Sequence, residues 1–298
     1  MRILHLDSGR EMRGGQWQVL RLMEGLRREN IECTLLSPRG SPLLDQARAH
    51  GLDVRPLGLW AVHRLARQSD VVHAHDARTH TLAAALNGAP LVVSRRVAFP
   101  IRSRWKYRRA SRYAAVSQFV KGVMLDGGVP ADKISVVYDG VPLGESVGHA
   151  ETIGETVVAP ASGDPLKGTA LALEATRRAG VDLLLSRDLE SDLAGAGLFL
   201  YLTRSEGLGS AILMAMAAGV PVIASNVGGI PEIVRHRENG WLAENEREPI
   251  AAAIRELLSD RALARGMAAR ARQTVAEKFS LDQMIQNTIH LYRQVLSC

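Results

Sequence analysis

Cysteines, aromatic residues and long apolar runs are all scarce in this sequence. Its two cysteines, Cys33 and Cys298, cannot form the disulfide framework that holds small secreted domains together, so a reducing compartment is favoured. No run approaches the roughly 20 apolar residues that a membrane-spanning helix needs. The first residues, MRILHLD, have the pattern of a strand and lack the apolar core of a signal peptide. We therefore expect a cytoplasmic protein.

The usual signatures of dinucleotide, metal and nucleophile sites are missing as well. The pair Gly14-Gly15 lies between a predicted strand and a predicted helix, but it is not part of a GxGxxG motif, and this argues against NAD. The pair alone is equally consistent with a phosphate or sugar contact and with a tight turn. No cysteine or spaced glutamate joins Asp76 and His80 in a metal set, so we expect no metal. No carboxylate pair or Ser-His-Asp arrangement stands out either.

Length and composition fit two domains of the α/β class. A chain of 298 residues can bury two cores, and 46% hydrophobic and 23% charged residues are ordinary for a globular protein. Apolar strand patterns alternate with helical ones, which predicts parallel sheets. Glycine, proline and scattered polar residues interrupt this pattern at 142–155 and predict a linker. We place the first domain at 1–143 and the second at 144–280.

One strand of the first domain ends in histidine. Residues 70–76, DVVHAHD, read as a buried strand whose end is polar. Alternation puts His73 and His75 on one face of the sheet. His75 lies at the carboxyl end of the strand, where open α/β sheets bind their ligands. We therefore interpret His75 as a functional residue and His73 as a histidine of the core.

The most informative stretch covers residues 203–234, TRSEGLGSAILMAMAAGVPVIASNVGGIPEIV. A polar, glycine-bearing turn precedes a predicted helix over 211–218, which Gly219 ends; a short apolar strand and a second glycine loop follow. The first N–H groups of a helix attract phosphate, and glycines let a ligand approach the backbone. Glu206 stands in the turn, where it can bind hydroxyl groups. Lys167, at another glycine-bordered helix start, is a second phosphate ligand. The pattern predicts a site for a phosphate and a polyol together.

The net charge of +6 is concentrated in one run that contains no acidic residue. The run consists of Arg95, Arg96, Arg102, Arg104, Lys106, Arg108, Arg109 and Arg112, and aromatic residues are interleaved with it. Each basic residue near an anionic bilayer contributes roughly 1 kcal/mol of attraction, which favours a membrane surface over a merely solvated helix face. The aromatic residues could also stack on bases, but no nucleic-acid module accompanies them, so we expect no nucleic acid. We assign Arg102, Arg104, Lys106, Arg108 and Arg109 to contact with the inner face of the plasma membrane.

These segments together resemble the GT-B glycosyltransferases of the glycosyltransferase 4 group. The resemblance rests on SEGLGSAILMAMAAGVPVIASNVGGIPEIV and on four further segments in the family's order: the Gly14-Gly15 loop, DVVHAHD, AAVSQFVKGV…GVPADKISVVYDGV and PLKG. The closing segment FSLDQMIQNTIHLYRQVL fits as well. The resemblance implies two Rossmann-like domains whose parallel sheets face a cleft, with a C-terminal helix, 281–298, packed back on the first domain.

The resemblance also implies the substrates and the reaction. The donor would be a nucleotide-diphosphate sugar, the acceptor a glycan or a lipid-linked, lipopolysaccharide-type glycan, and no cofactor would be needed. Transfer would retain the anomeric configuration without a metal, because the leaving phosphate oxygen would accept the proton of the acceptor hydroxyl on the same face of the sugar. The protein would then contribute charge stabilisation and positioning.

The roles of individual residues follow from the same resemblance. His75 and Glu206 would be catalytic, with His75 near the reacting sugar and Glu206 on the hydroxyl groups of the donor sugar. Lys167 would hold the donor pyrophosphate. The implied substrate-binding residues are Gly14, Gly15, Gln16, Lys167, Gly207, Leu208, Gly209 and Met214.

Three departures from the family pattern affect the donor site. Met214 occupies the position of a glutamate that usually binds the ribose, and Ser162 occupies that of an arginine. A charge-assisted hydrogen bond contributes roughly 1.5–3 kcal/mol, so one such loss lowers donor affinity by about one to two decades. The second domain also has only one strand–helix pair between Lys167 and the strand before Glu206, where the family has two. The alternative is therefore a degenerate GT-B scaffold that binds a nucleotide, a glycan or a partner without turnover.

Overall fold

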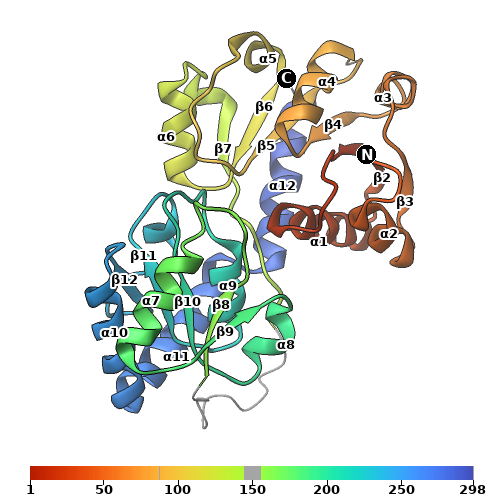
Figure 1. The fold of residues 1–298 in the computed structure, drawn as a ribbon. Helices are drawn as coiled ribbons and strands as arrows, with labels where there is room; N and C mark the ends of the chain where they lie inside the picture. Colours follow the sequence, from red (N-terminus) through yellow and green to blue (C-terminus); the bar gives the residue numbers. More distant parts are fainter. Residues whose placement is uncertain (87, 144–155, 298) are drawn as a thin grey trace. The chain divides into compact units, whose positions relative to one another are not determined.

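The structure is a computed structural model that describes residues 1–86, 88–143 and 156–297 (Figure 1). The chain forms two compact units: the first combines Met1–Asp139 with Leu281–Cys298, and the second is Gly140–Ser280. Each unit has one parallel sheet with helices packed on it, so the α/β prediction is confirmed. Among the described helices, none combines the length and the apolar character that a bilayer span requires.

The first unit contains a seven-stranded sheet of order β3-β2-β1-β4-β5-β6-β7. Its strands are β1 (Arg2–Leu6), β2 (Glu32–Ser37), β3 (Asp53–Pro56), β4 (Val71–Ala74), β5 (Leu91–Arg95), β6 (Arg112–Ala115) and β7 (Ile134–Val136). Its helices are α1 (Gly14–Arg28), α2 (Pro42–Ala49), α3 (Leu59–Ala66), α4 (Ala77–Leu86), α5 (Arg104–Arg109), α6 (Gln118–Asp126), the 3-10 turn η1 (Ala131–Lys133) and α12 (Leu281–Leu296). The strand order reverses between β1 and β4, and at such a point the carboxyl ends of two neighbouring strands leave room for a ligand.

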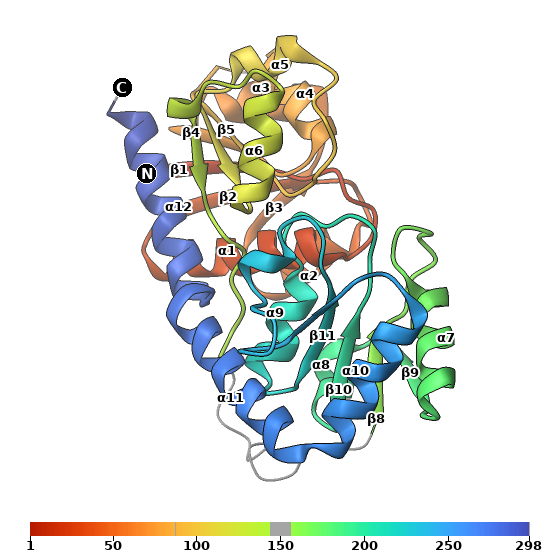
Figure 2. The ribbon, with the colours of Figure 1, turned by 90° about the vertical axis from the view of Figure 1, so that its left-hand side faces the viewer.

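Helix α12 completes the core of the first unit although it comes last in the sequence (Figure 2). Its apolar residues recur at helical spacing and are buried against α1, β4 and β6. The contact with α1 is close because Gly25 has no side chain: a Cβ there would lie 2.1 Å from Ile285 Cδ1. The sequence pattern had indicated this helix, and its apolar face explains why it is buried.

The N-terminal segment of the first unit ends at Asp139, slightly before the domain boundary that we expected after residue 143. Val141 already belongs to the second unit, because its N–H donates to Phe279 O at 3.0 Å and it pairs with Ser280 in a parallel bridge. Most of the predicted linker, residues 144–155, lies outside the described residues, as does Cys298.

The second unit contains a five-stranded sheet of order β12-β11-β10-β8-β9. Its strands are β8 (Thr156–Pro160), β9 (Leu183–Ser186), β10 (Ala196–Tyr201), β11 (Val222–Ser225) and β12 (Trp241–Ala243). Its helices are α7 (Thr169–Ala179), α8 (Leu189–Leu193), α9 (Ser210–Ala217), α10 (Arg247–Ser259), α11 (Arg261–Lys278) and the 3-10 turn η2 (Ile230–Glu232). Only β9 and α8 separate α7 from β10, which is the single strand–helix pair that the sequence predicted.

The predicted order of turn, helix, stop and strand in 203–234 is confirmed. Helix α9 begins at Ser210, and a run of alanine, leucine, isoleucine and methionine without a breaker continues it to Ala217. Gly219 follows with φ of 74°, a left-handed conformation that glycine adopts without strain. The next strand, β11, is buried along its whole length.

Candidate functional site

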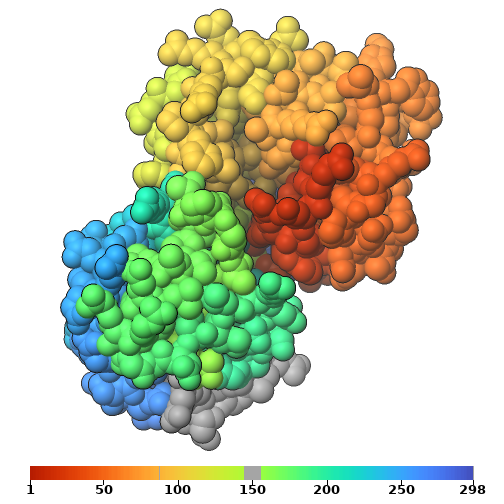
Figure 3. Space-filling view, in the orientation of Figure 1, coloured from red at the N-terminus to blue at the C-terminus, as the bar shows by residue number. Residues whose placement is uncertain are grey.

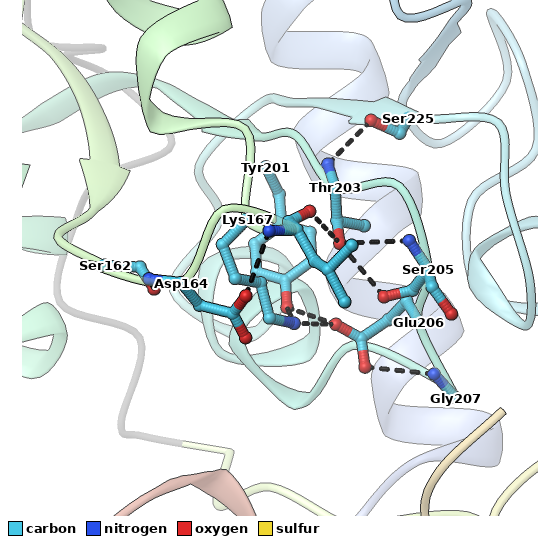
Figure 4. A network of polar contacts seen from close by, with 10 residues as sticks. Ser162, Asp164, Lys167, Tyr201, Thr203, Ser205, Glu206, Gly207 and Ser225 are labelled. Carbon is cyan, nitrogen blue, oxygen red and sulfur yellow. Dashed lines mark hydrogen bonds and ion pairs between the residues drawn. The ribbon is translucent and has the colours of Figure 1, made fainter. Parts of the chain in front are cut away.

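Three side chains of the second unit meet where β10 ends and α7 begins (Figure 4). Lys167 Nζ lies 2.5 Å from Glu206 Oε2 and donates to the Tyr201 hydroxyl at 3.1 Å. The Tyr201 hydroxyl donates to the same oxygen of Glu206 at 2.5 Å. The second oxygen, Glu206 Oε1, accepts from Gly207 N at 3.0 Å. An ammonium, a phenol and a carboxylate therefore form a closed triangle of polar contacts.

The loop that carries Lys167 is bonded directly to the loop that carries Glu206. Lys167 N donates to Asp164 O at 2.9 Å, which forms a turn just before α7. Thr203 Oγ1 donates to Leu166 O at 3.1 Å and thereby links this turn to the end of β10. These hydrogen bonds fix the two loops against each other, and so they keep Lys167 beside Glu206 although the two residues are far apart in the sequence.

The second glycine loop supports the backbone of Glu206. Gly229 N donates to Glu206 O at 3.2 Å. Gly228 has φ of 60°, and a Cβ at this position would lie 2.1 Å from Glu206 O. We had interpreted this loop as one that lets a ligand approach. In the structure the group that approaches Gly228 is the Glu206 carbonyl, so the glycine is needed to position Glu206.

The turn between Glu206 and α9 presents the start of that helix. Gly207, Leu208 and Gly209 are buried, and Gly209 has φ of 105°, which lies in the region that favours glycine. No side chain caps the N-terminus of α9 within the described residues. Met214 lies in the second turn of α9 and is half-buried.

The triangle combines a protonated phenol with an ion pair that water can reach. Burial raises the pKa of Tyr201 well above its ordinary value, and the neighbouring Glu206 carboxylate adds to this effect. The phenol therefore keeps its proton and donates a hydrogen bond to Glu206. The side chains of Lys167 and Glu206 are 34% and 15% exposed. The ion pair is accessible to an incoming ligand, whereas Tyr201 lies beneath it at 8% exposure.

A pocket of about 790 Å³ adjoins Lys167 in the second unit. The loop after β8, the first turns of α7 and the start of α10 form its wall. Ser162, where the family resemblance implies an arginine, lines the pocket, and its Oγ accepts from Asp164 N at 3.2 Å. Arg204, from the loop before Glu206, is exposed in the same wall.

In the first unit, His75 belongs to a buried cluster of three histidines. His5 on β1 lies opposite His73 on β4, and His5 Nδ1 is 2.9 Å from His75 Nε2. The ring nitrogens of His73 are hydrogen-bonded to the hydroxyls of Tyr292, at 2.6 Å, and Ser94, at 2.8 Å. Burial lowers the pKa of His5 to about 3 and lowers those of His73 and His75 well below the ordinary value. All three rings are therefore neutral at pH 7.

The histidine cluster differs from the metal set that we considered and rejected. One nitrogen from each of His5, His73 and His75 lies within 4.8 Å of the others. Both nitrogens of His73 already have hydroxyl partners, so an ion would have to displace one of them. His80 lies elsewhere and donates to Lys106 O at 3.1 Å, and Asp76 accepts hydrogen bonds from Ser8 and Thr79. That no metal is required remains a prediction.

The Gly14-Gly15 loop starts α1 beside the carboxyl end of β1. Gln16 Nε2 donates to both oxygens of Asp7, at 3.2 and 3.1 Å, so Gln16 contacts a carboxylate of its own unit. Gly14 is exposed and Gly15 is half-buried. A Cβ at Gly15 would lie 3.9 Å from Arg96 Cδ. The ends of β1, β4 and β5 thus bring Asp7, His75 and Arg96 to one edge of the sheet.

Two residues of the basic run are bonded to α4, and three exposed arginines make no such bond. Lys106 donates to Ala77 O at 3.0 Å, and Arg109 donates to Ala84 O at 3.1 Å, so both fasten α5 to α4. Arg102, Arg104 and Arg108 are exposed. Two aromatic residues are exposed with them, Phe99 at 54% and Trp105 at 46%. This segment forms part of the surface of the first unit, drawn in yellow in Figure 3.

Sequence reasoning missed Tyr201, His5 and Asp7. Tyr201 stands in the apolar run LFLYL, where it reads as a core residue. His5 and Asp7 flank the end of the first strand, and only the pairing of β1 with β4 brings them to His75. A polar residue at the end of an apolar parallel strand is the signal that could have found Asp7 and Tyr201.

Two family descriptions match consecutive parts of the chain. Residues 12–145 match Glycosyltransferase Family 4, and residues 162–274 match Glycosyl transferases group 1. Together these matches include both candidate regions, the histidine strand of the first unit and the Lys167–Glu206 loops of the second.

Curated relatives match over shorter stretches. N-acetyl-alpha-D-glucosaminyl L-malate synthase of Bacillus anthracis is 39% identical over 105 residues, which are 35% of this chain and 28% of that protein. The GDP-mannose-dependent alpha-(1-6)-phosphatidylinositol monomannoside mannosyltransferase of Mycobacterium tuberculosis is 44% identical over 80 residues, 26% of this chain and 21% of that protein. The matched part therefore spans less than a third of the length of these relatives.

The fold is shared over the whole chain with solved structures. The crystal structure of Anabaena Alr3699/HepE in complex with UDP and glucose superposes with a TM-score of 0.85 at 19% identity, covering 99% of this chain and 100% of that one. At this identity the likeness concerns the fold. With the two family matches, it shows that the chain belongs to the group 1 glycosyltransferases of glycosyltransferase family 4 and has the GT-B fold.

Proposed function

We propose that this chain is a retaining, metal-independent glycosyltransferase that moves a sugar from a nucleotide-diphosphate sugar to a glycan or a lipid-linked, lipopolysaccharide-type glycan. The contact of Lys167 with Glu206 beside the start of α9 carries the proposal. An ammonium and the N–H groups at a helix start attract a diphosphate, and a carboxylate accepts hydrogen bonds from sugar hydroxyls. The family of the chain supports this assignment, as do the UDP and glucose in the Anabaena structure.

In the proposed reaction the protein positions the substrates and stabilises charge. Lys167 and the N–H groups of Leu208 and Gly209 bind the diphosphate, while the N–H of Gly207 holds Glu206, which binds hydroxyls of the donor sugar. The bond from the anomeric carbon to the leaving phosphate oxygen breaks, and the acceptor oxygen bonds to that carbon on the same face. The leaving oxygen takes the proton of the acceptor. His75 is assigned as a catalytic residue, and because burial keeps it neutral, it acts as a hydrogen-bond partner.

The remaining assigned residues have supporting roles in this proposal. Gly14, Gly15 and Gln16 contribute the start of α1 to substrate binding. Met214 faces the ribose without the hydrogen bonds that a glutamate would make, so donor affinity rests on Lys167, Glu206 and the helix start. A degenerate scaffold that binds the donor without turnover is the second candidate, and Met214 and Ser162 are the observations that favour it.

Nucleotide binding tests the donor site directly. UDP, GDP, ADP and CMP are to be compared by thermal shift, and at least one is expected to stabilise the protein at millimolar concentration. Lys167→Ala is expected to weaken that binding by about one to two decades, because it removes a charge-assisted hydrogen bond to phosphate. Lys278→Ala, at an exposed lysine of the same unit, is the matched control. The enzyme proposal fails if no nucleotide and no nucleotide sugar shifts the melting temperature.

A membrane surface is proposed for the exposed part of the basic run. The acceptor is proposed to be membrane-bound, and the lipid named for the mycobacterial relative supports this. Replacing Arg102, Arg104 and Arg108 with glutamine is expected to lower binding to vesicles of anionic phospholipid by about tenfold or more in flotation. Lys106 and Arg109 are left unchanged because they hold α5 on α4. The control replaces Arg28, Arg39 and Arg293, three exposed arginines of the same unit; equal loss in both variants would refute a specific surface.

A further inference from the structure

Tyr201 is the one member of the polar triangle that the proposed function does not use. It is the last residue of β10, and only 8% of it is exposed. Its hydroxyl contacts both charged partners, accepting from Lys167 Nζ at 3.1 Å and donating to Glu206 Oε2 at 2.5 Å. The hydroxyl therefore lies at the junction of the two groups that are proposed to bind different parts of the donor (Figure 4).

A diphosphate that binds Lys167 competes with Glu206 for the ammonium group. In the structure the ammonium and the phenol share one oxygen of Glu206, and the N–H of Gly207 holds the other. When a diphosphate engages Lys167, Glu206 loses its positive partner in a site where its side chain is 85% buried. A carboxylate left there without a donor would be costly, and it would also be free to rotate.

The Tyr201 hydroxyl can keep a hydrogen bond on Glu206 and can also fix the orientation of its carboxylate when Lys167 turns to the diphosphate. A buried phenol that keeps its proton continues to donate to Glu206 after Lys167 has turned to the phosphate. With Gly207 N on one oxygen and Tyr201 on the other, the carboxylate plane is held while each oxygen keeps lone pairs for sugar hydroxyls. The hydroxyl of Tyr201 also accepts from Lys167, so its removal frees the ammonium from one competing partner.

We propose that Tyr201 is a positioning residue of the donor site, which holds the Glu206 carboxylate for the donor sugar while Lys167 moves to the diphosphate. This inference rests on the proposed function. It adds that Tyr201 affects how the sugar portion of the donor is bound. The residue acts through Glu206 and not through contact with the nucleotide. Tyr201 is therefore expected to affect the affinity for a nucleotide sugar and not the affinity for the nucleoside diphosphate alone.

The test compares two ligands that differ only in the sugar. Dissociation constants of UDP and UDP-glucose, and of GDP and GDP-mannose, are measured by calorimetry for the wild type and for Tyr201→Phe. With the pair that binds, the variant is expected to weaken sugar-nucleotide binding about tenfold. Binding of the nucleoside diphosphate should stay within about twofold or tighten, since Lys167 has lost one competing acceptor.

The control separates positioning from folding. Tyr113→Phe removes another buried phenol hydroxyl, which donates to Tyr107 O at 2.6 Å in the first unit. It should lower the melting temperature to a similar extent and leave both dissociation constants unchanged. Equal weakening of both ligands by Tyr201→Phe would make Tyr201 a structural residue and overturn the inference. No binding of any of the four ligands by the wild type, together with no stabilisation by ADP or CMP, would instead remove the proposed function, and with it the role given to Tyr201.

Discussion

Lowering the pH from 7 to 5 is expected to unfold the first unit while the second unit stays folded. Four histidines of the first unit are buried in the neutral form. Burial lowers the pKa of His5 to about 3 and that of His80 to about 4, and it lowers those of His73 and His75 well below the ordinary value. Among the described residues of the second unit, the histidine is His236, which is exposed.

The direction of the effect follows from which state binds the protons. In the unfolded chain these histidines titrate near pH 6.5, whereas in the folded unit burial lowers the pKa of each of them. Their stabilising contribution is complete above about pH 7 and is lost as the pH falls below 6.5, because only the unfolded chain takes up protons there. Well below pH 6.5 each histidine then costs about 1.4 kcal/mol for each further pH unit, and four together cost about 5 kcal/mol for each pH unit. A domain is stable by only about 5–15 kcal/mol.

Neighbouring charged groups change how steeply the free energy of unfolding depends on pH, but they do not reverse the direction of this dependence. The charge of Arg96 adds to the lowering of the pKa of His73 and of His75. Asp7 acts in the opposite sense, because burial raises the pKa of its carboxyl and the folded unit then takes up that proton first. One carboxyl offsets part of the effect of one histidine, so the loss of stability towards acid remains large.

Hydrogen exchange measured by mass spectrometry at pH 7, 6 and 5 distinguishes the two units. Peptides from β1, β4 and α12 are expected to lose protection before peptides from β10 and α9. His5→Asn removes one titrating ring and should reduce the pH dependence of unfolding by about one proton. Equal protection of both units at pH 5, or a slope that His5→Asn leaves unchanged, would show that the buried rings are not what limits acid stability.

Replacing Gly228 with alanine is expected to remove sugar-nucleotide binding almost completely. The added Cβ would lie 2.1 Å from Glu206 O, which is a backbone atom and cannot turn aside as a side chain could. The loop must shift, and the hydrogen bond from Gly229 N to Glu206 O shifts with it. Glu206 then leaves its place beside Lys167 and Tyr201. The hydrogen bonds between Glu206 and the donor sugar are then lost, and each bond to a charged group contributes roughly 1.5–3 kcal/mol to binding.

A second glycine separates this displacement from backbone strain. Gly219 has φ of 74°, similar to the 60° of Gly228, but nothing lies within 4 Å of a Cβ added there. Gly219→Ala should therefore cost only the roughly 1–2 kcal/mol of a left-handed residue and keep donor affinity. The two variants are to be compared by melting temperature and by calorimetry with a nucleotide sugar. If Gly219→Ala loses affinity as fully as Gly228→Ala, the effect comes from destabilisation and not from the position of Glu206.

The predictability of the site differs from one residue to the next. Lys167 and Glu206 were found because each lies in a polar loop next to a glycine and a helix start, a pattern that is local in the sequence. Tyr201 was not found, because a tyrosine in an apolar strand carries no sign of what its hydroxyl meets. The basic run shows the converse: its composition was plain, yet only the structure shows that Lys106 and Arg109 donate to carbonyls of α4, whereas the exposed Arg102, Arg104 and Arg108 make no such bond.

The sequence by itself determined the alternation of strands and helices, and with it the two parallel sheets. Helical spacing, alternation of apolar residues and the position of glycines act over a few neighbouring residues, and such short-range constraints can be read without knowing the fold. Only the tertiary structure decided which side chains meet. The pairing of β1 with β4 brings His5 to His73 and His75, and the approach of two loops brings Gly228 to Glu206 and Lys167 to Tyr201. These contacts join residues distant in the chain, and they depend on strand order and register, which arise from packing the whole unit around its core.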